Sequence, residues 1–153
     1  MSHMTPEIAA KDIRDEFDFL DDWEDRYAHI IDLGKANPQL AETEMTEETR
    51  VRGCTSNVWI LTAIDDEGRM HIRAMSDAMI VSGLIALLVR LFSGARVQDI
   101  LDFDAEALLG TIGVTGALTA QRSNGLASML VRIRSDAQRA TASSQPADGT
   151  AKS

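Results

Sequence analysis

The chain has 153 residues, of which 44% are hydrophobic and 25% are charged, and it carries a formal net charge of −9 at pH 7. This length and composition predict one soluble globular domain with its own hydrophobic core. The acidic balance argues against nucleic acids and anionic membranes as partners, and no apolar run reaches the roughly 18 residues that a membrane-spanning helix requires.

The negative charge is concentrated at the N-terminal end of the chain. Residues 1–50 hold 14 of the 24 acidic residues and 5 of the 15 basic ones, and so account for the whole net charge. Two uses remain open for them: solvated helix faces, the commoner case, or contact with a basic partner. Residues 1–4 resemble a cloning remnant running into a second start. With one cysteine and no secretory signal, we expect a reducing, cytoplasmic setting.

The first structured segment should be helical. Thr5 before Pro6 is typical of a helix start with a threonine N-cap. Apolar residues at helical spacing then predict one or two amphipathic helices, with a break near Asp21-Asp22 where an aspartate could cap the second helix. Gly34 and Asn37-Pro38 should end the second helix, and residues 38–46 should form a loop.

The periodicity changes after residue 49. The run 58–64 is apolar on both faces and predicts a central strand, and residues 65–68 form a turn into a second hairpin strand over 69–74. Asp65 and Asp66 lie shortly before Gly68, so they are interpreted as turn residues and not as an acid–base pair. Ser76-Asp77 should cap a strongly apolar helix over 78–92.

The C-terminal half predicts more helices. Short helices are expected over 97–101 and 105–109, and a last one should begin near Ser123. Gly110, Gly113 and Gly116 lack the lysine of a phosphate-binding loop and are interpreted as a connection. From about Thr141 the composition predicts a disordered tail. The predicted organisation is therefore one domain over 5–140 and a tail over 141–153.

Cys54 is the single cysteine, in the sequence Arg50-Val51-Arg52-Gly53-Cys54-Thr55-Ser56-Asn57-Val58-Trp59-Ile60. An unpaired cysteine is often a small buried hydrophobe. Gly53 before it and the polar residues Thr55 and Ser56 after it favour a bend at the surface instead. These local features leave both interpretations open.

Other chemistry is weakly supported. His29 lies in an acidic helix and His71 in a strand, and neither stands in a signature for thiol-based hydrolysis. One cysteine and scattered histidines give no metal-ligand spacing, so no metal site is expected. Arg122 beside the predicted N-cap Ser123 would make an electropositive position, which could stabilise an anionic sulfur if the fold brought it to Cys54.

Several motifs occur in an order that resembles a known family. They are Gly53-Cys54-Thr55-Ser56-Asn57-Val58-Trp59, Ser76-Asp77-Ala78 with Ile80-Val81-x-Gly83-Leu84, and Arg122-Ser123-Asn124-Gly125-Leu126, preceded by Ile31-x-Leu33-Gly34-Lys35 and Pro38-x-Leu40. From about residue 13 to residue 135 the chain resembles the SufE-like cysteine desulfuration proteins, which include SufE and CsdE. The resemblance implies an α+β fold, with a small antiparallel sheet packed against helices, similar to scaffold proteins of the IscU type.

The resemblance also implies a function. Cys54 would accept persulfide sulfur from a pyridoxal-phosphate cysteine desulfurase of the SufS or CsdA type and pass it to an iron–sulfur scaffold, with no cofactor of its own and no turnover without the desulfurase. We expect a mobile loop over 51–56 that turns the sulfur inward at rest. Gly53, Thr55, Ser56, Asp77, Arg122, Ser123 and Asn124 are the candidate supporting or partner-contact residues, although capping alone would equally explain Asp77 and Ser123.

Three other functions compete with this one. The chain could be a regulatory binding module of a desulfurase in which Cys54 is incidental. A single-cysteine redox protein would need a thiol at a helix N-terminus, whereas Cys54 precedes a predicted strand. An iron–sulfur scaffold would need several cysteine ligands.

Overall fold

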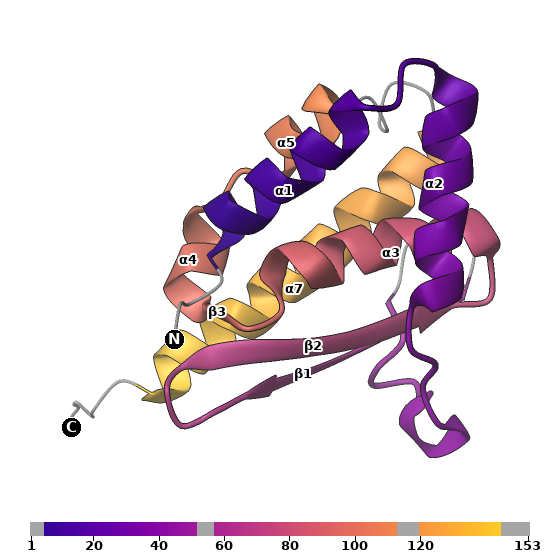
Figure 1. Ribbon diagram of the computed structural model, residues 1–153. Coiled ribbons are helices and arrows are strands. Elements are labelled where there is room, and N and C mark those ends of the chain that lie inside the picture. Colours follow the sequence, from indigo (N-terminus) through magenta and orange to yellow (C-terminus); the bar gives the residue numbers. More distant parts are fainter. Residues whose placement is uncertain (1–4, 52–56, 113–119, 145–153) are drawn as a thin grey trace.

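The computed structural model describes residues 5–51, 57–112 and 120–144, and for 120–126, 143 and 144 it describes the backbone alone. The fold is α+β (Figure 1), as expected, and its described elements follow in the order α1 (Pro6–Asp18), α2 (Trp23–Ala36), the 3₁₀ helix η1 (Glu42–Glu44), β1 (Val58–Ile64), β2 (Arg69–Ser76), α3 (Met79–Phe92), β3 (Ala95–Arg96), α4 (Val97–Asp102), α5 (Ala105–Thr111) and α7 (Ala120–Ser144).

One antiparallel sheet, in the order β1-β2-β3, is covered on one face by helices. Figure 1 shows α3 and α7 on the same side of the sheet, with α1 beyond α3. The core between these layers is made mostly of aliphatic side chains, and the aromatic Phe17 and Phe92 are among the largest fully buried residues. No helix in the described ranges is long and apolar enough to cross a membrane.

The two N-terminal helices begin where the sequence predicted. The Ile8 amide donates to Thr5 Oγ1 at 3.2 Å and the Asp25 amide donates to Asp22 Oδ1 at 2.9 Å, so both N-caps are confirmed. Each bond satisfies an amide that has no partner within its own helix. Ile13 is fully buried against the core.

Gly34 does not end α2, contrary to the sequence prediction, because the helix continues to Ala36 and its C-cap is Asn37. Gly34 is instead where α2 crosses α3. A Cβ atom on Gly34 would lie 2.7 Å from the Gly83 backbone nitrogen, and one on Gly83 would lie 2.0 Å from the Ile30 carbonyl oxygen. The two glycines therefore let the backbones of the helices touch.

The predicted hairpin is confirmed, but the expected place of its first strand is wrong. Cα partners run from Val58 with Ser76 to Ile64 with Met70. The middle strand is β2, while β1 lies at one edge and is extended only by an isolated bridge between Arg50 and Trp59 among the described residues. The apolar run over 58–64 therefore reflects a strand whose one face is buried at Val58 and Ile60 and becomes exposed toward Ile64, while its other face is only partly covered.

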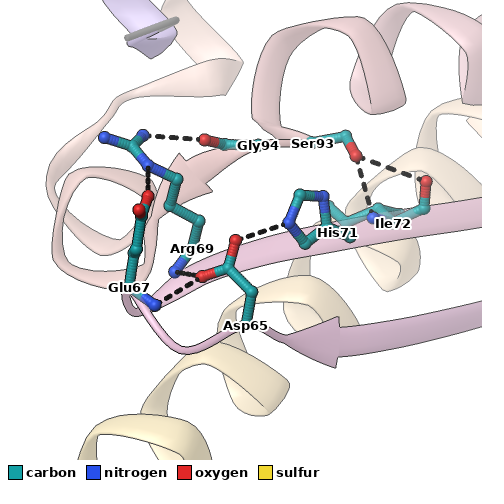
Figure 2. A network of polar contacts seen from close by, with 7 residues as sticks. All are labelled: Asp65, Glu67, Arg69, His71, Ile72, Ser93 and Gly94. Carbon is teal, nitrogen blue, oxygen red and sulfur yellow. Dashed lines mark hydrogen bonds and ion pairs between the residues drawn. The ribbon is translucent and has the colours of Figure 1, made fainter.

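Figure 2 shows how the turn of this hairpin is held. Asp65 Oδ1 accepts the amides of Glu67 at 2.9 Å and Arg69 at 3.0 Å, and Oδ2 lies 2.8 Å from His71 Nε2. The hydrogen bond from His71 lowers the pKa of Asp65 to about 2. Gly68 adopts a φ of 79°, which favours glycine. Asp65 is thus a turn residue, as predicted.

The same network joins the hairpin to the end of α3, which the sequence did not predict. Arg69 Nη1 donates to the Gly94 carbonyl oxygen at 2.9 Å, and the Ile72 amide donates to Ser93 Oγ at 2.9 Å (Figure 2). These contacts place the two residues of β3 beside β2.

The C-terminal helices differ from prediction at their ends. The expected short helices are present as α4 and α5, and Gly110 lies inside α5 while Gly113 and Gly116 fall outside the described residues. The last helix starts at Ala120, so Ser123 lies within it and is not its N-cap. It continues past Thr141 to Ser144, and the predicted tail beyond that point lies outside the described residues.

The helix crossing gives a matched pair of variants. Gly83→Ala should lower the free energy of unfolding by about 3 kcal/mol, because the new methyl group meets backbone atoms that cannot move aside. Gly110→Ala should raise it by about 1 kcal/mol, since nothing lies within 4 Å of that Cβ and alanine favours the helix. Urea denaturation of both variants tests this, and equal effects would contradict the crossing.

A second prediction concerns acid. Arg134 binds both carboxylate oxygens of Glu106, at 2.9 and 2.8 Å, and this bond holds the pKa of Glu106 down to about 2. A depressed carboxyl pKa stabilises the fold above the unfolded pKa of 4.5, and the contribution is lost as the pH falls toward 2. The melting temperature of Glu106→Gln should therefore lie slightly below that of wild type at pH 7, and the gap should close by pH 2 in a thermal titration.

Candidate functional site

The Cys54 segment, residues 52–57, is flanked in the described structure by two closely paired residues. The Val51 amide donates to the Val58 carbonyl oxygen at 2.8 Å, and the Ile60 amide donates to the Thr49 carbonyl oxygen at 2.8 Å. Val51 and Val58 are both buried. Residues 49–51 therefore run antiparallel to the start of β1, and positions 52–57 connect them. Gly53, Cys54, Thr55 and Ser56 lie outside the described residues, and of the mobile loop predicted over 51–56 only Val51 is described.

Asp77 holds the end of the segment that leads into β1. The Asn57 amide donates to Asp77 Oδ1 at 3.3 Å, and Asn57 Nδ2 donates to Oδ2 at 2.7 Å. The Asp77 amide returns a bond to the Asn57 carbonyl oxygen at 3.3 Å. Three bonds between the same two residues fix the distance between the start of β1 and the chain just after β2.

This arrangement corrects the predicted role of Ser76-Asp77 as a helix cap. The N-cap of α3 is Ala78, which has no capping side chain, and the helix starts at Met79. Ser76 Oγ accepts the Ala78 amide at 3.1 Å, while the Asp77 carboxylate turns toward Asn57. Asp77 thus belongs to the surroundings of the Cys54 segment.

A cleft of about 330 Å³ opens beside Asp77, between α2, the end of β2 and the start of α3. Gly34 forms part of its wall, so the close helix crossing lies at the cleft. Its polar groups include Lys35, Gln39 and Asp77. The apolar side chain of Met79, which is 57% exposed, stands at its rim. The cleft therefore offers mixed polar and apolar surface next to the residue that holds the Cys54 segment.

The histidines are engaged elsewhere in the fold. His29 Nε2 contacts Glu16 Oε1, and Arg90 lies 2.8 Å from the other oxygen of the same carboxylate. Burial raises the pKa of Glu16, but the hydrogen bonds from His29 and Arg90 outweigh it and leave the pKa lowered. His71 belongs to the hairpin turn. Among the described residues, no group of three or more His, Cys, Asp or Glu side chains could hold a metal ion.

The comparisons with known proteins identify the family. Residues 11–137 match the sequence model described as "SufE: Fe-S metabolism associated domain". The chain belongs to the SufE family. Its Cys54, Ser76-Asp77 and Arg122-Ser123 motifs all lie inside the matched range.

Similar proteins agree with this assignment. An uncharacterized SufE-like protein of Rhizobium meliloti (strain 1021) is 43% identical, with 82% of this chain and 92% of the relative covered. One of Rhizobium etli is 46% identical, with 82% and 87% covered. A solution structure of a hypothetical protein from Thermus thermophilus superposes with a TM-score of 0.73 at 19% identity, over 91% of this chain and 98% of the other, which shows a shared fold.

The remaining candidate residues of this SufE-family chain lie on α7. Arg122, Ser123 and Asn124 are in its first two turns, as their backbone shows, and their side chains are outside the described set. Whether they face Cys54 therefore stays a prediction. Sequence reasoning missed the role of Asn57, whose amide side chain binds Asp77. Its place directly after Ser56 was the only available signal.

The Asp77–Asn57 contact predicts a local effect. Asp77→Ala removes both acceptors of Asn57, so the Asn57 amide should exchange with solvent about tenfold faster, as expected when a hydrogen bond to a charged group is lost. Hydrogen exchange followed by NMR measures this. Asp66→Ala, an exposed substitution in the β1–β2 turn, is the control and should leave the Asn57 rate unchanged. Equal exchange in wild type and Asp77→Ala would contradict the anchoring role.

Proposed function

We propose that Cys54 accepts sulfane sulfur from the persulfide of a pyridoxal-phosphate cysteine desulfurase, stimulates that enzyme, and passes the sulfur to iron–sulfur cluster assembly. The observation that carries the proposal is the match to the SufE family over residues 11–137 in a chain with a single cysteine. The family is associated with iron–sulfur metabolism, and a carrier of one sulfur atom needs one thiol.

The proposed transfer is an exchange between sulfur atoms. The Cys54 thiolate attacks the outer sulfur of the desulfurase persulfide, and a new S–S bond forms on Cys54 as the S–S bond of the partner breaks. The desulfurase cysteine leaves as a thiolate, so the sulfane sulfur moves with no net oxidation or reduction. The pyridoxal phosphate acts only in the desulfurase, and this chain supplies the acceptor thiol.

The surroundings of the segment support this role. The two ends of the Cys54 segment are held by two contacts. One is the backbone pairing of Val51 with Val58, and the other is the contact between Asp77 and Asn57. Asp77 acts in the proposal by holding the segment, and Gly53, Thr55, Ser56, Arg122, Ser123 and Asn124 are proposed to contact it or the partner.

The partners follow from the chemistry. The donor is a desulfurase of the SufS or CsdA type, and the acceptor is a scaffold on which iron–sulfur clusters are assembled. We place the reaction in the cytoplasm, since a persulfide carrier with one free cysteine suits a reducing compartment. Neither nucleic acid nor membrane takes part in the proposal.

The Cys54→Ser variant tests the proposal. Wild-type protein incubated with an active desulfurase and cysteine, without added reductant, should gain the mass of one or more sulfur atoms, and Cys54→Ser should gain none in intact-mass measurement. Addition of dithiothreitol should reverse the gain, because a persulfide is reducible.

The same variant distinguishes the regulatory alternative. A sulfur acceptor should lose its stimulation of desulfurase turnover when Cys54 is replaced, whereas a binding module would keep it. No sulfur on wild type with a desulfurase shown to be active, or full stimulation by Cys54→Ser, would refute the proposal.

A further inference from the structure

Arg132, on α7, binds the backbone of the segment that leads to Cys54. Its Nη2 donates to the Glu48 carbonyl oxygen at 2.6 Å, and its Nη1 donates to the Arg50 carbonyl oxygen at 3.2 Å. The guanidinium carries its donors in a rigid planar fork, so two carbonyls bound at once fix both their spacing and their direction. Because the acceptors are backbone atoms, the contact does not depend on the side chains at positions 48 and 50.

Asp136, one turn further along α7, orients this guanidinium. Its Oδ2 lies 3.5 Å from Arg132 Nε and accepts a hydrogen bond from Thr62 Oγ1 of β1 at 2.9 Å, and Oδ1 contacts Arg139. The Asp136 side chain is only 7% exposed. A carboxylate buried to this degree requires its partners, so Arg132 and Thr62 are held in fixed positions relative to each other.

The contact lies on the side of the segment that β1 does not reach. In an extended antiparallel pair, successive residues direct their backbone polar groups to opposite edges. The Thr49 carbonyl and the Val51 amide bind β1, which leaves the Arg50 carbonyl directed away from it. Arg132 binds that outer carbonyl, and so it takes the place that a further strand would have in a larger sheet.

We propose that Arg132, oriented by Asp136, is a positioning residue for Cys54. It holds residues 48–50 between α7 and β1 and so fixes the described chain that leads to the Cys54 segment. The inference rests on the proposed function for its purpose, while the anchoring itself can be tested without a desulfurase.

The Arg132→Gln variant tests the anchoring. The Val51 and Ile60 amides should exchange about tenfold faster than in wild type, and iodoacetamide should alkylate the single thiol at least about threefold faster, because a released segment samples more open positions. In sulfur transfer from a desulfurase, Arg132→Gln should need a higher concentration than wild type to reach half of its maximal rate, because only a fraction of its molecules is competent to bind. The maximal rate itself should change little.

Two further variants separate positioning from general stability. Arg134→Gln is the matched control, because Arg134 lies on the same helix and likewise binds a carboxylate, of Glu106, and a carbonyl, of Phe103. It should lower the melting temperature comparably and leave the alkylation rate at the wild-type value. Arg132→Lys keeps the charge but loses the planar fork of donors, so the alkylation rate of this variant should lie between those of wild type and Arg132→Gln. If Arg132→Gln does not fold, Arg132→Lys tests the anchoring in its place.

The outcomes distinguish this inference from the proposed function. Wild-type alkylation and exchange rates in both Arg132 variants, or equal acceleration by Arg134→Gln, would overturn the positioning role even if wild type accepts sulfur. Failure of wild type to accept sulfur would remove the proposed function, and faster alkylation of Arg132→Gln alone would still establish that Arg132 holds the segment.

Discussion

The contact between the backbones of α2 and α3 is the constraint on which the rest of the site depends. It requires glycine at positions 34 and 83, because a methyl group at either would meet backbone atoms at 2.7 Å or less. Around the crossing, Ser82 Oγ donates to the Gly34 carbonyl oxygen and Asn37 Nδ2 donates to the Ala74 carbonyl oxygen of β2. The end of α2, the start of α3 and the end of β2 are thus held together, and the cleft beside Asp77 lies among them.

From this junction the Cys54 segment is held at both ends by contacts of different kinds. One end is held by Asp77, whose carboxylate binds the backbone and side chain of Asn57. The other is held by a backbone ladder on one side and by Arg132 on the other. The anchors come from Asp77, directly after β2, and from α7, which are far apart in the sequence.

Several acidic side chains are paired with basic ones in the described structure. Glu16 binds His29 and Arg90, Glu44 binds Arg73, and Glu106 binds Arg134. These pairs join separate elements, and most are partly exposed, so each contributes little to stability. The acidic side chains of α1 and α2 that face solvent keep both of their earlier interpretations.

Much of the fold was predictable because it depends on local chemistry. Thr5 and Asp22 cap their helices as expected, since capping involves residues three positions apart, and the turn at Asp65 to Gly68 follows from the same kind of short-range bond. Gly34 was misinterpreted as a helix end because a glycine in sequence does not show whether its missing side chain serves a turn or a helix crossing. Ser123 was misplaced as a cap because the helix extends further toward its N-terminus than its apolar pattern.

The sequence by itself determined the family, the single thiol and the order of the elements, because these depend on residue identity and short-range spacing. Only the tertiary structure decided that Asp77 faces Asn57 instead of capping α3, that β1 lies at the sheet edge, and that Arg132 holds the chain before Cys54. Each of these depends on contacts between residues far apart in the sequence, and such pairings are set by how the elements pack and not by any pattern along the chain.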